Sequence, residues 1–173
     1  MENTQTLETI AEVAIALAGF SGIVAVLGQR SAGEWSPAER VRLRLLLEVS
    51  LLVVFLSFLP SLMLRGTSLI AAWRISNGVC GLVHLLPLAL YFVRWRRLGW
   101  QKPVHEPTSP LFFNAYSLAL ATGGLVIILL QLMIAAGLTP GEPSLIYEIS
   151  LLWLLGVGAI QFVNLLLYRS REA

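Results

Sequence analysis

Charged side chains are scarce in this chain of 173 residues: Asp, Glu, Lys and Arg make up 13% of it, and hydrophobic residues 57%. A typical soluble domain carries about 25% charged residues. A soluble protein of this length has too little interior to hide so much apolar surface. The composition therefore excludes an ordinary soluble domain and indicates a protein embedded in a lipid bilayer.

Cysteine and histidine are also nearly absent. Cys80 is the single cysteine, which excludes a disulfide framework. The two histidines, His84 and His105, lie too far apart in the sequence to indicate a metal site, and there is no HExxH or paired-cysteine pattern. We therefore expect no metal and no cofactor.

Signatures of nucleotide binding and catalysis are lacking as well. The chain has no GxxxxGKS/T loop, no GxGxxG and no GxSxG. The segments between the apolar stretches are too short to hold a constellation of catalytic side chains, so we predict that the protein is not an enzyme. The basic cluster at 94–97, Arg-Trp-Arg-Arg, favours anchoring to anionic lipid headgroups over binding to nucleic acid.

What the chain does have is five apolar stretches, each long enough to cross a bilayer. A spanning helix needs about 20 largely apolar residues, and helices satisfy their backbone groups within lipid, where isolated strands cannot. The sequence predicts an all-α, polytopic bundle in a single domain, 1–173, with five transmembrane helices at approximately 7–28, 41–64, 68–93, 111–138 and 145–168.

The basic residues alternate along the chain and predict its orientation. Ten of the twelve Lys and Arg residues follow the first, third and fifth stretches, at 30–44, 94–102 and 169–171. Because positive residues collect on the cytoplasmic side, we predict an external N-terminus and a cytoplasmic C-terminus. Five spans likewise place the two ends on opposite sides.

Two proline-containing motifs predict where helices begin. Ser36-Pro37-Ala38-Glu39 is a capping box with proline at the first helical position. Ser109-Pro110 predicts the start of the fourth long helix in the same way. Just inside the second helix, Arg44 and Glu48 are four residues apart, which predicts an ion pair at the inner interface.

The first span has a small and acidic side and a bulky side. Ala14, Ala18 and Gly22 follow the small-xxx-small spacing that lets helix backbones approach closely. On a helical wheel with about 100° per residue, this side also carries Glu8, Glu12, Ala11, Gly19 and Ala25. The bulky side carries Ile10, Val13, Leu17, Phe20, Val24 and Leu27. One interpretation is tight packing, with both glutamates at the headgroup level. The other is a pore or cavity with an acidic mouth.

Polar side chains also occur within the later spans, as Asn77, His84, Gln131, Gln161 and Asn164. Ionisable and polar groups within a membrane usually face the bundle interior or water. For His84, the alternatives are a neutral imidazole hydrogen-bonded to another helix and a proton relay or ion site. For the amides, hydrogen bonds between helices are favoured over a substrate path.

Three functions fit this pattern. The first is a homo-oligomeric ion channel with helix 1 near the axis, because rings of Glu12 would concentrate cations at its mouth. The second is a non-catalytic subunit or signalling partner of a larger membrane complex. The third is a small proton-coupled transporter centred on His84, which ranks last because the chain shows no inverted repeat.

The segment 11–28, with its Ala-Gly-Phe-Ser-Gly core at 18–22, resembles segments of small bacterial inner-membrane proteins of unknown function. The resemblance implies a multi-pass protein of the bacterial plasma membrane. It assigns no role to any residue.

Overall fold

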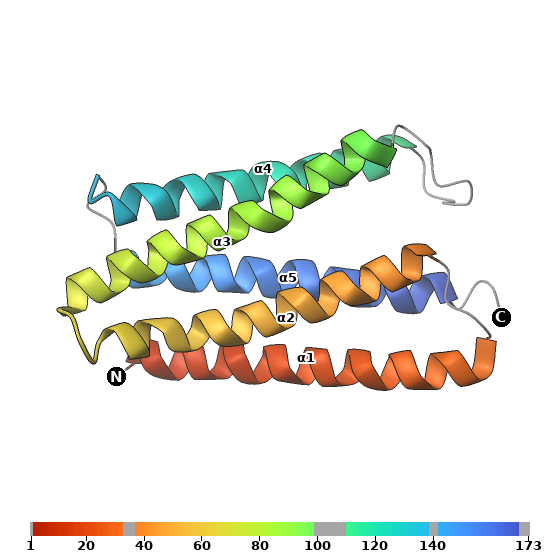
Figure 1. The fold of residues 1–173 in the computed structure, drawn as a ribbon, viewed down its shortest axis with the longest axis horizontal. Helices are drawn as coiled ribbons and strands as arrows, with labels where there is room; N and C mark the ends of the chain where they lie inside the picture. Colours follow the sequence, from red (N-terminus) through yellow and green to blue (C-terminus); the bar gives the residue numbers. More distant parts are fainter. Residues whose placement is uncertain (1, 33–36, 99–109, 139–141, 170–173) are drawn as a thin grey trace. The chain divides into compact units, whose positions relative to one another are not determined.

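The structure, a computed structural model, describes residues 2–32, 37–98, 110–138 and 142–169. Side chains are described for 5–26, 43–85, 118–138, 142–163 and 166. Within these residues the helices are the only regular secondary structure and there are no strands, which confirms the predicted all-α class. The helices are α1 (Glu2–Ala32), α2 (Pro37–Met63), α3 (Leu69–Leu98), α4 (Pro110–Ala135) and α5 (Pro143–Arg169) (Figure 1).

Four of these helices are long and apolar enough to cross a membrane. Their apolar segments are Gln5–Val26, Leu43–Met63, Leu118–Ala135 and Pro143–Val163. In α3 the described apolar segment, Leu69–Leu85, is shorter than the roughly 20 residues that a span needs. The third of the five predicted spans, the orientation and the bacterial location therefore stay predictions.

Proline marks the beginning of three helices. α2 begins at Pro37 and α4 at Pro110, as the sequence motifs predict, and α5 begins at Pro143. Proline suits the first helical position because its fixed φ is already helical and its missing N–H has no partner to lose there.

The end of α4 differs from the predicted span, which ran to Leu138. The helix ends at Ala135 because Gly137 adopts a left-handed conformation with φ 73°. The N–H of Gly137 donates to Ile134 O and that of Leu138 to Met133 O, both at 2.9 Å. This is a Schellman motif, which satisfies the last carbonyls of a helix.

The chain forms two compact units. Unit 1 comprises residues 1–68 and 148–173, and unit 2 comprises residues 69–147. Helix α5 belongs to both, since its first five residues lie in unit 2 and the rest in unit 1. Because one continuous helix runs through both units, their division does not test the predicted single domain.

In unit 1, α1 packs along α2, and α5 packs on both through a glycine. A Cβ placed on Gly158 would lie 3.3 Å from Leu17 Cδ2 and 3.7 Å from side-chain carbons of Leu46 and Val49. Bulky side chains of α1 and α2 thus fill the space that Gly158 leaves open. The buried core of this unit includes Ala14, Leu46, Val53, Leu56, Leu151 and Leu154.

In unit 2, α3 packs along α4 through two glycines. A Cβ on Gly78 would lie 3.3 Å from Ala135 Cβ, and one on Gly81 would lie 3.4 Å from Gln131 Cβ. Small residues allow the close helix approach on which association in lipid depends.

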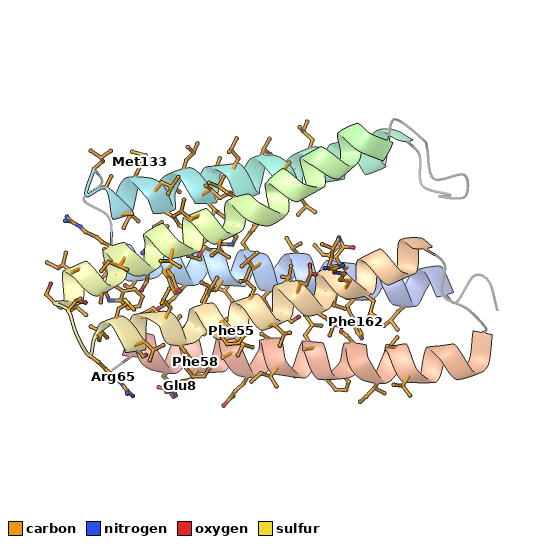
Figure 2. The ribbon with its side chains drawn as sticks, viewed as in Figure 1. Glu8, Phe55, Phe58, Arg65, Met133 and Phe162 are labelled. Carbon is orange, nitrogen blue, oxygen red and sulfur yellow. The ribbon has the colours of Figure 1, made fainter. Side chains whose placement is uncertain are left out.

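Large apolar side chains cover the exterior of the helices. Phe55 is 74% exposed, Phe20 is 60% exposed and Leu118 is 65% exposed, and Phe55 and Phe58 are labelled on α2 in Figure 2. Contiguous exposed apolar surface is rare on soluble monomers. It is the surface that a membrane protein presents to lipid.

Candidate functional site

The exposed face of α1 carries both acidic residues of the first span. Glu8, Glu12 and Gly19 are exposed, and Gly22 is half-buried. The buried face consists of Leu7, Ile10, Ala11, Ala14 and Ser21. Residues that the helical wheel grouped on one small and acidic side of α1 are therefore partly buried and partly exposed in the structure. Ala11 and Ala14 are buried together with bulky residues, whereas the glutamates and Gly19 are exposed.

This division has a packing cause. Leu17, from the predicted bulky side, lies against Gly158 of α5. The face of α1 that contacts the other helices therefore includes part of the predicted bulky side. As a result, Glu8, Glu12 and Gly19 point away from the other helices of unit 1.

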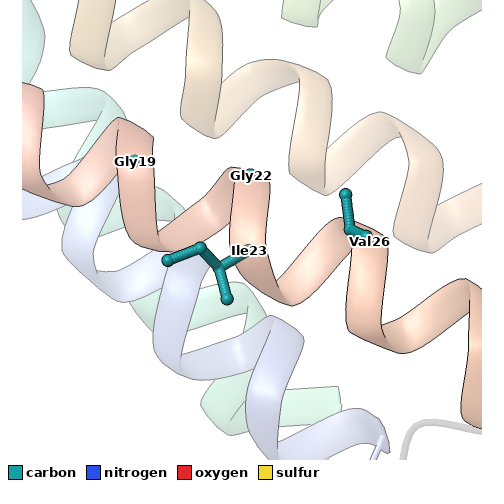
Figure 3. Close-up of a pocket in the computed structure, with 4 residues that line it drawn as sticks. All are labelled: Gly19, Gly22, Ile23 and Val26. Atoms are coloured by element: carbon teal, nitrogen blue, oxygen red, sulfur yellow. The ribbon is translucent and has the colours of Figure 1, made fainter.

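Farther along the same face, α1 has an open groove lined by Gly19, Gly22, Ile23 and Val26 (Figure 3). A Cβ placed on Gly19 or Gly22 would meet nothing within 4 Å. These two glycines therefore differ from Gly78, Gly81 and Gly158, whose small size is used by a neighbouring helix within the chain. The groove leaves room for the close approach of another helix.

Glu12 lies within the apolar segment of α1 rather than at its end. It is seven residues beyond Gln5, where that segment begins, which is about 10 Å along the helix. Between Glu12 and Arg30 the helix has seventeen residues without a charge, or about 26 Å, which is less than the roughly 30 Å of hydrocarbon. A bilayer-spanning α1 would therefore place Glu12 at the edge of the hydrocarbon layer.

Within the described residues, neither Glu8 nor Glu12 forms a hydrogen bond or an ion pair through its carboxylate. Arg65, which is also exposed, lies at the same end of unit 1 as Glu8 (Figure 2). An ionised group facing lipid is costly, and such groups usually pair or face water. The partner of Glu12 is therefore expected outside the described part of the chain, for example as water or as another protein.

A second polar group lies buried between α3 and α4 in unit 2. His84 Nδ1 is 3.2 Å from Gln131 Oε1 and 3.6 Å from Cys80 Sγ. His84 is 8% exposed, and Gln131 and Cys80 are fully buried. The contact joins two predicted polar residues that are 47 positions apart in the sequence. It is the interhelical hydrogen bond that was one of the two interpretations of His84.

Asn77 lies one helical turn before Cys80 and connects α3 to the beginning of α5. Its Nδ2 donates to Trp73 O and to Pro143 O, both at 2.9 Å. Next to it, the rings of Trp73 and Tyr147 meet edge to face, with centroids 5.8 Å apart. The amide and the aromatic pair together fasten the first turn of α5 to α3.

Not every buried polar atom of unit 2 has a partner. His84 Nε2, Asn77 Oδ1 and Ser76 Oγ are buried without a hydrogen-bonding partner. Among the described residues, no group of three or more His, Cys, Asp and Glu is placed to hold a metal ion.

The remaining predicted residues do not join either group. Arg44 Nε contacts Glu48 Oε1 at 2.5 Å, with both side chains more than half exposed. Gln161 is half-buried on α5, and the side chain of Asn164 lies outside the described residues. The predicted residues thus form two clusters in different units: the exposed face of α1, and Asn77, His84 and Gln131 in unit 2.

Sequence reasoning missed residues that position these groups. Gly78 supports the α3–α4 contact, and its Gly-x-x-Gly spacing with Gly81 is a signal that could have indicated it. The Arg74 guanidinium lies against Gly137 at the carbonyl end of α4, where a positive charge is favourable. No motif in the sequence indicates that contact.

Comparison of the chain with protein-family models, with curated protein sequences and with solved structures finds no match. The functional argument therefore depends on the geometry of the α1 face and of the α3–α4 cluster.

Proposed function

We propose that this chain is a multi-pass integral membrane protein that assembles through the exposed face of α1 into a homo-oligomeric cation channel. The observation that carries the proposal is the outward position of Glu12, which has no partner among the described residues and lies within the apolar segment of α1. A water-filled path lined by α1 gives this carboxylate the solvation that lipid denies it.

The glycine groove supports assembly through the same face. Gly19 and Gly22 leave open space beside α1, and small residues at a helix surface let a second helix approach closely in lipid. Copies of α1 around an axis would bring Glu8 and Glu12 to one mouth of the path. Rings of carboxylates favour cations over anions.

A planar-bilayer recording of the purified protein tests conduction. Discrete current steps with cation preference are expected, and Glu12→Gln should reduce that preference. Glu48→Gln is the matched control, because Glu48 is also an exposed carboxylate but contacts Arg44 on α2. A silent bilayer, or equal effects of the two variants, would contradict the channel.

Disulfide cross-linking tests assembly separately. In a Cys80→Ser background, Ile23→Cys places a thiol in the α1 groove, and Phe55→Cys places one on the 74% exposed surface of α2. Oxidation in bilayers should give a covalent dimer for Ile23→Cys and far less for Phe55→Cys. Equal yields would show random collisions and would remove the α1 face as the interface.

The open groove on α1 equally suits a helix of a different protein, so a subunit of a larger membrane complex is the second candidate. It predicts that a single other protein co-purifies with the wild type and is lost from Gly19→Leu, a variant that fills the groove. The purified chain alone would then be monomeric and silent in the bilayer.

A further inference from the structure

The α3–α4 cluster has unsatisfied hydrogen-bonding capacity in a defined place. His84 is 8% exposed and Asn77 is fully buried, yet His84 Nε2 and Asn77 Oδ1 have no partner. The other polar atom of each side chain is in use: His84 Nδ1 meets Gln131, and Asn77 Nδ2 donates to two carbonyl oxygens. Both side chains are therefore held in place while one atom of each is left open.

The two open atoms require the same kind of partner. An amide oxygen only accepts, so the contact with Gln131 Oε1 selects the tautomer that carries its proton on His84 Nδ1 and leaves a lone pair on Nε2. Asn77 Oδ1 is likewise an acceptor. A ligand that satisfies them must donate hydrogen bonds.

We propose that the cluster is an internal hydration site, in which buried water donates hydrogen bonds to His84 Nε2 and to Asn77 Oδ1. Internal water characteristically satisfies buried polar groups that protein atoms do not reach. The two residues are seven positions apart on α3, or about 10 Å along its axis. Each atom therefore holds its own water molecule.

Other ligands fit less well. A metal ion requires several convergent ligands, and the described residues offer no cluster of three or more His, Cys, Asp and Glu. Gln131 and Cys80 each have a further interaction, so neither is free to become a ligand.

Magnetic resonance of ¹⁵N-labelled histidine in lipid bilayers tests the site. The chain has two histidines, so His105→Gln leaves His84 as the only labelled ring. Magnetisation from water protons should reach this ring at short mixing times, and the Nε2 resonance should be that of a hydrogen-bonded acceptor. Because the native His84 side chain is observed, the result does not depend on a core variant folding.

Two further outcomes are decisive. If the ring receives magnetisation only from protein and lipid protons, and Nε2 has the resonance of a free lone pair, the site is dry and the proposal is wrong. In the second variant, Asn77→Leu, transfer from water to His84 should persist, because the two waters are separate. Its loss in a variant whose helical circular dichroism is unchanged would overturn the two-water arrangement.

Discussion

The two polar groups of this molecule face opposite environments. In unit 2, Asn77, His84 and Gln131 are turned inward and bond to other protein atoms. On α1, Glu8 and Glu12 are turned outward without a partner in the described chain. Since lipid provides no hydrogen bonds, the inward group is explained within the chain, whereas the outward group requires water or another protein. The residues of unit 2 therefore stabilise the fold, whereas the glutamates of α1 are the candidates for function.

The glycines differ in the same way, and valine substitutions should show the largest contrast. Gly81→Val would force side-chain atoms into Gln131 and Leu132, and overpacking of this kind costs about 1–3 kcal/mol. Gly19→Val meets open space, so the unfolding free energy of the monomer should change by less than about 0.5 kcal/mol. Denaturant titration in detergent measures both. Equal losses would mean that the α1 groove is already filled.

The second largest effect is expected at the end of α4. Gly137→Ala places a side chain on a residue with φ 73° and at 3.0 Å from the Arg74 guanidinium. The left-handed conformation alone costs a non-glycine residue about 1–2 kcal/mol. Gly66→Ala is the control, because its Cβ would meet nothing within 4 Å. A thermal denaturation midpoint that falls equally in both variants would contradict the strain at Gly137.

Removing the interhelical hydrogen bond should have a smaller effect. Gln131→Leu keeps the volume of the side chain and deletes the acceptor that His84 Nδ1 uses. Such bonds in membrane proteins contribute about 0.6–2 kcal/mol. A double-mutant cycle with His84→Leu isolates the coupling, and a value of zero would show that the 3.2 Å contact does not stabilise the helix pair.

The apolar lengths and proline positions predicted the helices well because both signals are local. A span must be apolar over a fixed length, and proline constrains its own φ whatever surrounds it. The starts at Pro37 and Pro110 depend on nothing more distant. The end of α4 was missed because Leu138 is apolar and extends the span by composition, while the stop depends on the φ of Gly137.

The orientation of α1 was not predictable from its own wheel. Its periodicity shows which residues share a side, but the contact with Gly158 of α5 decides which side is buried. Similarly, the sequence places His84 and Gln131 on two helices, and only their packing brings the two side chains to 3.2 Å. Contacts between helices are thus the part of the site that a single sequence leaves open.

The smallest effect is expected for the pair that was simplest to predict. Arg44 and Glu48 are adjacent on one helix face and in contact, but their side chains are 71% and 54% exposed. An exposed pair loses most of its Coulomb attraction to solvent and salt and must also restrict two long side chains. A double-mutant cycle of Arg44→Gln and Glu48→Gln in detergent should therefore give no measurable coupling in unfolding free energy, and raising the salt concentration should change nothing. A coupling larger than the His84–Gln131 value would contradict this ranking of exposed and buried polar groups. It would mean that a partner covers this end of α2 and shields the Arg44–Glu48 pair from water.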